Sequence, residues 1–184
     1  MKVLLLPILL LALSLSVFAQ KTADSLNRQI KSLKAEKNIT ISPAGSTTRI
    51  MGAAPNFDQK EARLAGIQAM KFGMAVFFAG TALAETPHTI DITFWVLTKK
   101  PRFEAGRDGV LVLDKEDLAL GPAVWSSKPA SNMEYLNFKV PRENISKLVS
   151  SSQQKIKLGN WLFTFTPEQV SLLRNFLAVT DAAD

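Results

Sequence analysis

Few side chains in this sequence could carry out chemistry, and the rarest of them is a single histidine. His88 follows Pro87 in a predicted turn, and an acid–base role would need a carboxylate such as Glu85 or Asp91 beside its imidazole. One histidine excludes sites built from two or three imidazoles. The absence of cysteine excludes thiol catalysis, iron–sulfur clusters and thiolate zinc sites. We interpret His88 as an ordinary exposed turn residue.

The densest acidic cluster is the tetrapeptide Asp114-Lys115-Glu116-Asp117. A calcium site needs many oxygen ligands from a loop of defined spacing, and this tetrapeptide, interrupted by a lysine, is predicted to be a solvated hairpin turn. Carboxylates that hydrolyse glycosides need not be adjacent in sequence, so a hydrolase using scattered carboxylates stays open as an alternative. No serine lies in a Gly-x-Ser-x-Gly elbow and no glycine-rich phosphate loop is present, so the sequence indicates no cofactor and no catalytic or metal residue.

Trp95 is the one residue that the sequence offers as a contact for a ligand. It falls in phase with Asp91 and Thr93, on the polar face of a predicted strand. An exposed tryptophan on a sheet could bind a sugar or a protein partner. The alternative is a second buried face of the sheet that a terminal helix covers.

The N-terminus has the pattern of a cleaved secretory signal. Lys2 precedes an apolar run from Val3 to Val17, and Ala19 offers a small residue just before Gln20. The run is shorter than the roughly 20 apolar residues that span a bilayer, so no transmembrane helix is expected in the mature chain. Residues 1–19 are therefore predicted to be a signal peptide, and the mature chain is expected to be periplasmic or extracellular. The net charge of +6 is too modest to indicate nucleic acid binding.

The mature chain is predicted to hold an N-terminal helical segment over 20–37 and a single β-rich domain over 38–184. Strands are predicted at 39–41, 47–51, within 64–84, and at 90–96, 110–113, 118–125 and 136–140. Loops are predicted at 53–60, 99–108 and 126–132. Many short strands joined by turns favour a mainly β fold, an antiparallel sandwich or open barrel with an N-terminal helix, a short helix near 141–149 and a C-terminal capping helix.

The C-terminal section has the clearest local signals. Gly159-Asn160 between two apolar-alternating segments is typical of a type II′ hairpin, which pairs Ile156 with Phe163 and Leu158 with Trp161. A helix is then expected, with Thr166 as its cap, Pro167 in its first turn and Gln169 at the capping-box position. Its predicted buried stripe consists of Val170, Leu173, Phe176 and Leu177.

The same section carries the runs Lys157-Leu158-Gly159, Phe165-Thr166-Pro167-Glu168-Gln169 and Leu173-Arg174-Asn175-Phe176-Leu177, with Phe163 between the first two. It resembles the ending of uncharacterised exported bacterial proteins with a β-rich domain. The segment from Leu111 to Leu120, with its acidic turn at Asp114, is also similar to theirs. The resemblance implies a β-rich exported domain and transfers no activity. We therefore expect a non-catalytic domain of the cell envelope or extracellular space that binds another protein or a surface ligand.

The export prediction can be tested directly. When the chain is expressed with its signal in a bacterial host, we expect it outside the cytoplasm with Gln20 as its new N-terminus, which intact mass analysis will report. Recovery of only full-length cytoplasmic protein would overturn the assignment.

Overall fold

A computed structural model describes residues 38–44, 46–80, 83 and 85–181. The predicted signal peptide and the predicted helical segment at 20–37 lie outside these residues. Within them the chain is mainly β, with two antiparallel sheets and three α-helices, so the prediction of an antiparallel sandwich with a C-terminal helix is confirmed. None of the described helices is long and apolar enough to cross a membrane.

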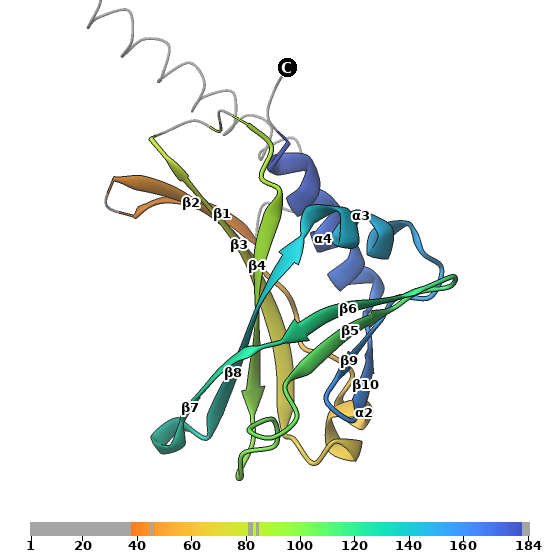
Figure 1. Ribbon diagram of the computed structural model, residues 1–184. Helices are drawn as coiled ribbons and strands as arrows, with labels where there is room; N and C mark the ends of the chain where they lie inside the picture. Colours follow the sequence, from red (N-terminus) through yellow and green to blue (C-terminus); the bar gives the residue numbers. More distant parts are fainter. Residues whose placement is uncertain (1–37, 45, 81–82, 84, 182–184) are drawn as a thin grey trace, which may run out of the picture.

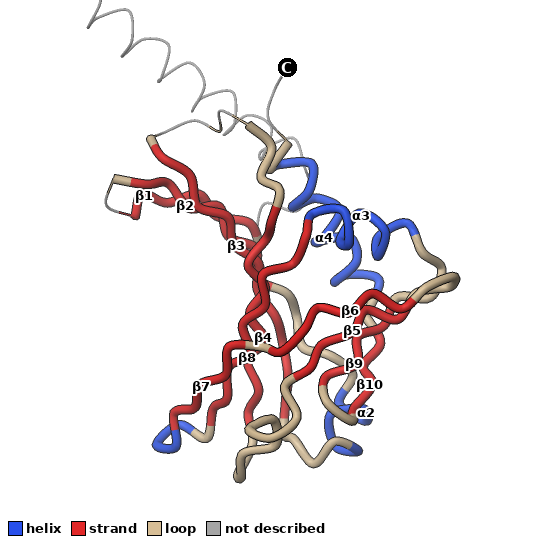
Figure 2. Tube along the Cα trace, viewed as in Figure 1, coloured by secondary structure: helices blue, strands red, loops and turns tan. Residues whose placement is uncertain are grey.

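The two sheets differ in size (Figures 1 and 2). The larger has the order β1-β2-β3-β4-β8-β7, made of β1 (Ile39–Ala44), β2 (Thr47–Ala53), β3 (Ala69–Ala79), β4 (Thr89–Leu97), β8 (Met133–Pro141) and β7 (Val124–Lys128). The smaller has the order β10-β9-β5-β6, made of β10 (Trp161–Thr164), β9 (Lys155–Leu158), β5 (Asp108–Val112) and β6 (Asp117–Pro122). The helices are α2 (Gln59–Leu64), α3 (Arg142–Ser150) and α4 (Pro167–Val179), and a 3-10 turn, η1, spans Pro129–Ser131.

A cluster of phenylalanine rings joins the two sheets. Phe72 on β3 and Phe94 on β4 lie with ring centroids 5.8 Å apart, and Phe57, from the segment before α2, packs against both. Phe57 also reaches the smaller sheet, where its ring lies 5.8 Å from that of Phe163 and 5.4 Å from that of Phe165. Such tilted and edge-to-face contacts add to the free energy of burying the rings. The cluster therefore determines which side of the larger sheet is buried.

The smaller sheet and the described α-helices all lie on that one side of the larger sheet (Figure 1). Leu172 and Phe176 of α4 pack close above Gly52 of β2, where an added Cβ would lie 3.2 Å from the Phe176 ring. Helix α3 lies against α4. The larger sheet is thus covered by α3, α4 and the smaller sheet on its inner side.

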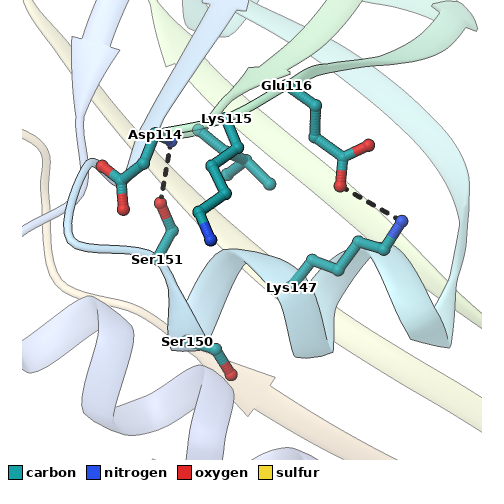
Figure 3. Close-up of a pocket in the computed structure, with 7 residues that line it drawn as sticks. Asp114, Lys115, Glu116, Lys147, Ser150 and Ser151 are labelled. Atoms are coloured by element: carbon teal, nitrogen blue, oxygen red, sulfur yellow. Dashed lines mark hydrogen bonds and ion pairs between the residues drawn. The ribbon is translucent and has the colours of Figure 1, made fainter.

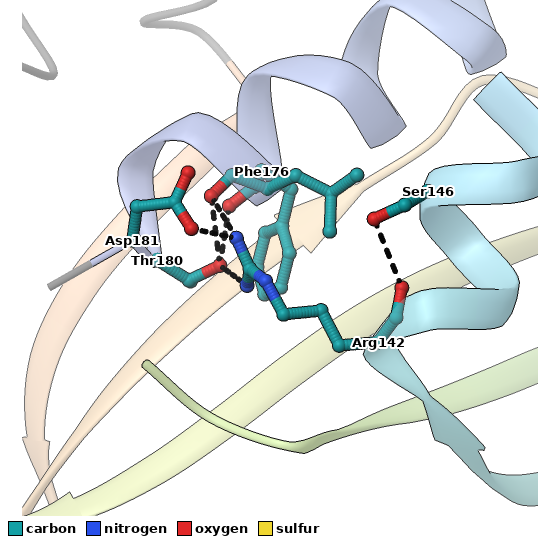
Figure 4. A network of polar contacts seen from close by, with 6 residues as sticks. Arg142, Ser146, Phe176, Thr180 and Asp181 are labelled. Carbon is teal, nitrogen blue, oxygen red and sulfur yellow. Dashed lines mark hydrogen bonds and ion pairs between the residues drawn. The ribbon is translucent and has the colours of Figure 1, made fainter. Parts of the chain in front are cut away.

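Arg142 fastens the start of α3 to the end of α4 (Figure 4). Its Nη1 donates to Thr180 Oγ1 at 2.7 Å, and its Nη2 donates to the carbonyl oxygen of Leu177 at 2.6 Å and pairs with Asp181. The last carbonyls of a helix have no partner within the helix, and the helix dipole favours a cation beside them. The guanidinium therefore caps α4 and fixes its position against α3.

The strand predicted within 64–84 is confirmed as β3, and large apolar side chains alternate along it. Met70, Phe72, Met74 and Val76 are all buried on the inner side. A glycine within a strand often marks a bulge, but the register of β3 with both neighbouring strands runs through Gly73 without a shift. Gly73 instead leaves room for the Trp95 ring, which an added Cβ would meet at 2.4 Å.

Three local predictions are also wrong. The loop predicted at 53–60 ends in α2, which Asp58 caps by accepting from the amides of Lys60 and Glu61. The single strand predicted at 118–125 is two strands, because the chain leaves the smaller sheet after Pro122 and enters the larger one at Val124. The polar loop predicted at 126–132 begins inside β7. The cap of α2 is a local signal, whereas the ends of β6 and β7 are set by pairing with strands of different sheets.

The C-terminal predictions are confirmed. Strands β9 and β10 pair Ile156 with Phe163 and Leu158 with Trp161, and Gly159 has the positive φ of +55° that the turn requires. Thr166 and Gln169 form the capping box of α4, and the predicted apolar stripe is buried. The short helix expected near 141–149 is α3.

These contacts predict the effect of two neighbouring substitutions. Phe163 is fully buried, so Phe163→Ala should lower the free energy of unfolding by about 3–5 kcal/mol through lost transfer energy and a cavity. Lys157 is exposed on the opposite face of the same hairpin, and Lys157→Ala should change it by no more than about 0.5 kcal/mol. Chemical denaturation measures both, and equally mild effects would contradict the register.

Candidate functional site

The larger sheet has a second face that no described helix or strand covers (Figure 1). Side chains of a strand alternate between the two faces of a sheet, so the residues between the core positions of β2, β3, β4, β8 and β7 point away from the core. We call the surface formed by these outward side chains the outer face. It contains Trp95, the ligand contact predicted from sequence.

Trp95 forms an aromatic pair with Tyr135, and a lysine flanks each of the two rings. The register places Lys71 of β3 opposite Trp95 on one side and Tyr135 of β8 opposite it on the other. The Lys71 ammonium lies 5.5 Å from the centroid of the Trp95 ring. On β7, the ammonium of Lys128 lies 5.6 Å from the centroid of the Tyr135 ring. Each ring thus carries a cation over its face, an arrangement favoured by the ring quadrupole.

The outer face is basic. Its outward positions on β2, β3, β4, β8 and β7 include four cationic side chains, Arg49, Lys71, Lys128 and Lys139, and one acidic side chain, Asp91. Lys139 stands opposite Asp91 across the β4–β8 pair, which leaves the other three cations without an acidic neighbour on this face. This imbalance gives the outer face a positive electrostatic potential.

Apolar and polar side chains fill the rest of the outer face. Val124 and Phe77 are 73% and 53% exposed, which is high for large apolar residues. Between them the Thr93 hydroxyl donates to Asn137 Oδ1 at 2.6 Å, and the Asn137 amide nitrogen donates to the carbonyl oxygen of Val124 at 3.2 Å. These two bonds tie β4, β8 and β7 together on their outward side, so the face is presented by a rigid element.

Trp95 differs from the other two tryptophans of the chain. Trp125 and Trp161 pack against the core, whereas Trp95 is half-buried on the opposite face, where it lies over Gly73. Sequence reasoning missed Tyr135, Lys71 and Lys128. The alternation in each strand shows that these residues point outward, but only the pairing of β3, β4, β8 and β7 shows that they surround Trp95.

A shallow pocket of about 230 Å³ lies elsewhere, between the β5–β6 turn and α3 (Figure 3). It is lined by three members of the acidic tetrapeptide, Asp114, Lys115 and Glu116. Lys147 of α3 pairs with Glu116 and with Glu143, each at 3.2 Å, and hydrogen bonds to these two carboxylates raise the pKa of Lys147. Glu116 is thus engaged in an ion pair that holds the turn to the helix.

Asp114 is also held by contacts within the chain, in its case by hydrogen bonds. Its carboxylate accepts from the Ser152 amide at 2.6 Å, from the Ser152 hydroxyl at 2.8 Å and from the Gln153 amide at 2.6 Å. The Asp114 amide donates to the Ser151 hydroxyl at 3.1 Å (Figure 3). The bonds from Ser152 lower the pKa of Asp114, the reverse of what a general acid requires. The predicted solvated turn is therefore bonded to the segment after α3.

Glu134 is a buried carboxylate that sequence reasoning missed. It is 1% exposed at an inner position of β8 and accepts from the backbone amides of Arg102 and Phe103, at 2.9 and 3.1 Å. The Trp125 indole donates to it at 2.9 Å. These N–H donors satisfy the buried carboxylate and hold the loop after β4 against the sheet, which places Phe103 in the core. Glu134 therefore has a structural role.

The remaining candidates form no chemical site in the described residues. His88 is exposed, and no hydrogen bond or ion pair joins its imidazole to Glu85 or Asp91. The described part of the chain contains no group of three or more His, Asp or Glu side chains placed to hold a metal ion. Comparisons of the chain with protein-family models, with curated proteins and with solved structures found no match.

The contacts of Asp114 predict a pH-dependent contribution to stability. Because its pKa in the folded chain is lowered from 3.8, its stabilising effect is present above that value and is lost as the pH falls through the folded pKa. We expect Asp114→Asn to lower the free energy of unfolding at about pH 7 and to have a smaller effect at about pH 3. Urea denaturation at both pH values measures this. Asp117→Asn, on the same hairpin, is the matched control, and a deficit that is equal at both pH values would contradict the assignment.

Proposed function

We propose that the chain is a non-catalytic binding domain of the cell envelope or extracellular space, and that the outer face is its recognition surface. The observation that carries this proposal is the outer face itself, where Trp95 and Tyr135 stand side by side between cations on a sheet face that no described element covers. Monomeric proteins rarely expose large apolar groups together unless the surface binds something.

The residue types on the outer face support recognition of a partner. Tryptophan, tyrosine and arginine are the residues that most often dominate binding energy at protein interfaces, and aromatic residues and methionine are enriched there. The outer face combines Trp95, Tyr135 and Arg49 with Met51 and Met133. Polar side chains lie at its middle, where the Thr93–Asn137 hydrogen bond links β4 and β8.

The alternative of a hydrolase using scattered carboxylates has less support. A hydrolase needs a free carboxylate with a raised pKa in a cleft, beside a second one. The carboxylates of the pocket at the β5–β6 turn are bound instead to Ser152, Gln153 and Lys147. The buried carboxylate of Glu134 accepts hydrogen bonds from three N–H donors. These acids position loops and helices.

The proposal predicts that the outer face carries the binding of the exported chain to envelope material. In a co-sedimentation assay with the envelope fraction of the producing cells, Trp95→Ala with Tyr135→Ala should weaken binding by about thirtyfold or more, since a central aromatic contact is worth about 2 kcal/mol. Leu162→Ala is the matched control, because Leu162 is 47% exposed on β10 of the other sheet.

Two results would contradict the proposal. One is binding that the outer-face variant retains at full strength while circular dichroism shows it folded. The other is hydrolysis of envelope polymers by the chain that Asp114→Asn or Glu116→Gln abolishes, which would favour the hydrolase.

A further inference from the structure

We infer that the outer face binds an extended acidic segment of a partner protein, in which two carboxylates flank an apolar or aromatic side chain. This inference rests on the proposed function and names the chemistry of the partner. Three observations carry it: the charge of the outer face, the spacing of its lysines and the way those lysines cover the aromatic rings.

The positive charge of the outer face argues against two possible binding partners, a second copy of the chain and the chain's own segment 20–37. A second copy would bring its own Arg49, Lys71 and Lys128 against the same three cations, and like charges brought together at an interface oppose binding. The chain's own segment 20–37 has five lysine and arginine residues and only two acidic ones. It therefore has the same sign of charge as the outer face, which opposes its binding there. An acidic partner is the complement.

The sheet register gives the spacing of the cations. Lys71 on β3 and Lys128 on β7 stand on either side of the Trp95–Tyr135 pair, with β4 and β8 between their strands. Strands lie about 4.8 Å apart, so the two lysine-bearing strands are about 14 Å apart. Lys128 pairs with Met133, two residues along β8 from Tyr135, so a peptide that reaches both lysines crosses the strands obliquely. An extended peptide advances about 3.4 Å per residue, so carboxylates four residues apart also stand about 14 Å apart on one side of it. The residue midway between them points the same way, towards Trp95 and Tyr135.

The position of the lysines favours a peptide over a glycan. A sugar binds an aromatic ring by lying on its open face, but the ammonium groups of Lys71 and Lys128 lie over the rings of Trp95 and Tyr135. Carboxylates of a peptide can pair with these ammonium groups directly, and the side chain between them can then contact the rings. The charged lysines at the margin and the aromatic pair at the centre match the usual arrangement of a protein interface.

The three tryptophans provide the readout for the test. In the ¹⁵N-labelled exported chain, the indole N–H of Trp95 reports on the outer face, while those of Trp125 and Trp161 report on residues packed against the core. The probe is a synthetic peptide of Glu-Ser-Tyr-Ser repeats, which places carboxylates four residues apart around a tyrosine. We expect it to shift the Trp95 indole signal selectively and to bind less tightly as the salt concentration rises.

Two controls separate the spacing and the charge. A peptide of the same composition with its glutamates adjacent should bind at least about tenfold more weakly, because only one lysine can then be reached. The double variant Lys71→Glu, Lys128→Glu should lose about tenfold or more in affinity for the repeat peptide. The control is the double variant Lys60→Glu, Lys157→Glu, which makes the same charge change at exposed positions on α2 and β9. This variant should bind the repeat peptide nearly as tightly as the original chain does.

The outcomes that overturn the inference are distinct from those that overturn the proposed function. Equal binding of the two peptides, or a Trp95 signal that polygalacturonate shifts and the repeat peptide does not, would remove the acidic peptide as partner. Either result leaves the proposed function standing if envelope binding still depends on Trp95 and Tyr135. Envelope binding that is independent of both would remove the proposed function.

Discussion

The structure depends on one constraint, the burial of phenylalanine rings between the two sheets. Phe72 and Phe94 of the larger sheet contact Phe57, which also contacts Phe163 and Phe165 at the smaller sheet. Successive side chains in a strand point to opposite faces, so once these rings face inward, every second residue of β3, β4 and β8 must face outward. The outer face, with its aromatic pair and its lysines, is therefore a direct consequence of how the core is built.

On the inner side of the larger sheet, polar contacts hold helices and loops in place. They involve charged side chains that could otherwise take part in chemistry. Arg142 binds the end of α4, Asp114 binds the segment after α3, and Glu134 holds the loop that carries Phe103. Each satisfies backbone groups that would be costly to leave unpaired. These three groups of the described residues thus serve the architecture of the chain.

A sheet face presents side chains differently from a pocket. On the outer face the distance between two groups is set by strand spacing and register, and the hydrogen bond between Thr93 and Asn137 ties two of the strands on that side. Such a surface suits recognition of an extended chain whose own repeat matches the strand spacing, because the rigid face loses little conformational entropy on binding. In the role that we propose, the cations over Trp95 and Tyr135 would favour acidic partners.

The sequence by itself determined those features whose physical cause is local. The capping box of Thr166 and Gln169 acts over three residues, the hairpin turn needs a positive φ at Gly159, and alternation along β4 already placed Trp95 outward. Helix α2 is too short to be recognised from periodicity, and its Glu61 accepts from Thr164, a residue far away in the chain. Only the tertiary structure decided that β6 and β7 belong to different sheets and that Lys71, Trp95 and Tyr135 are neighbours. These residues are brought together by pairing between strands distant in sequence, and that pairing depends on burial of the whole core rather than on any local pattern.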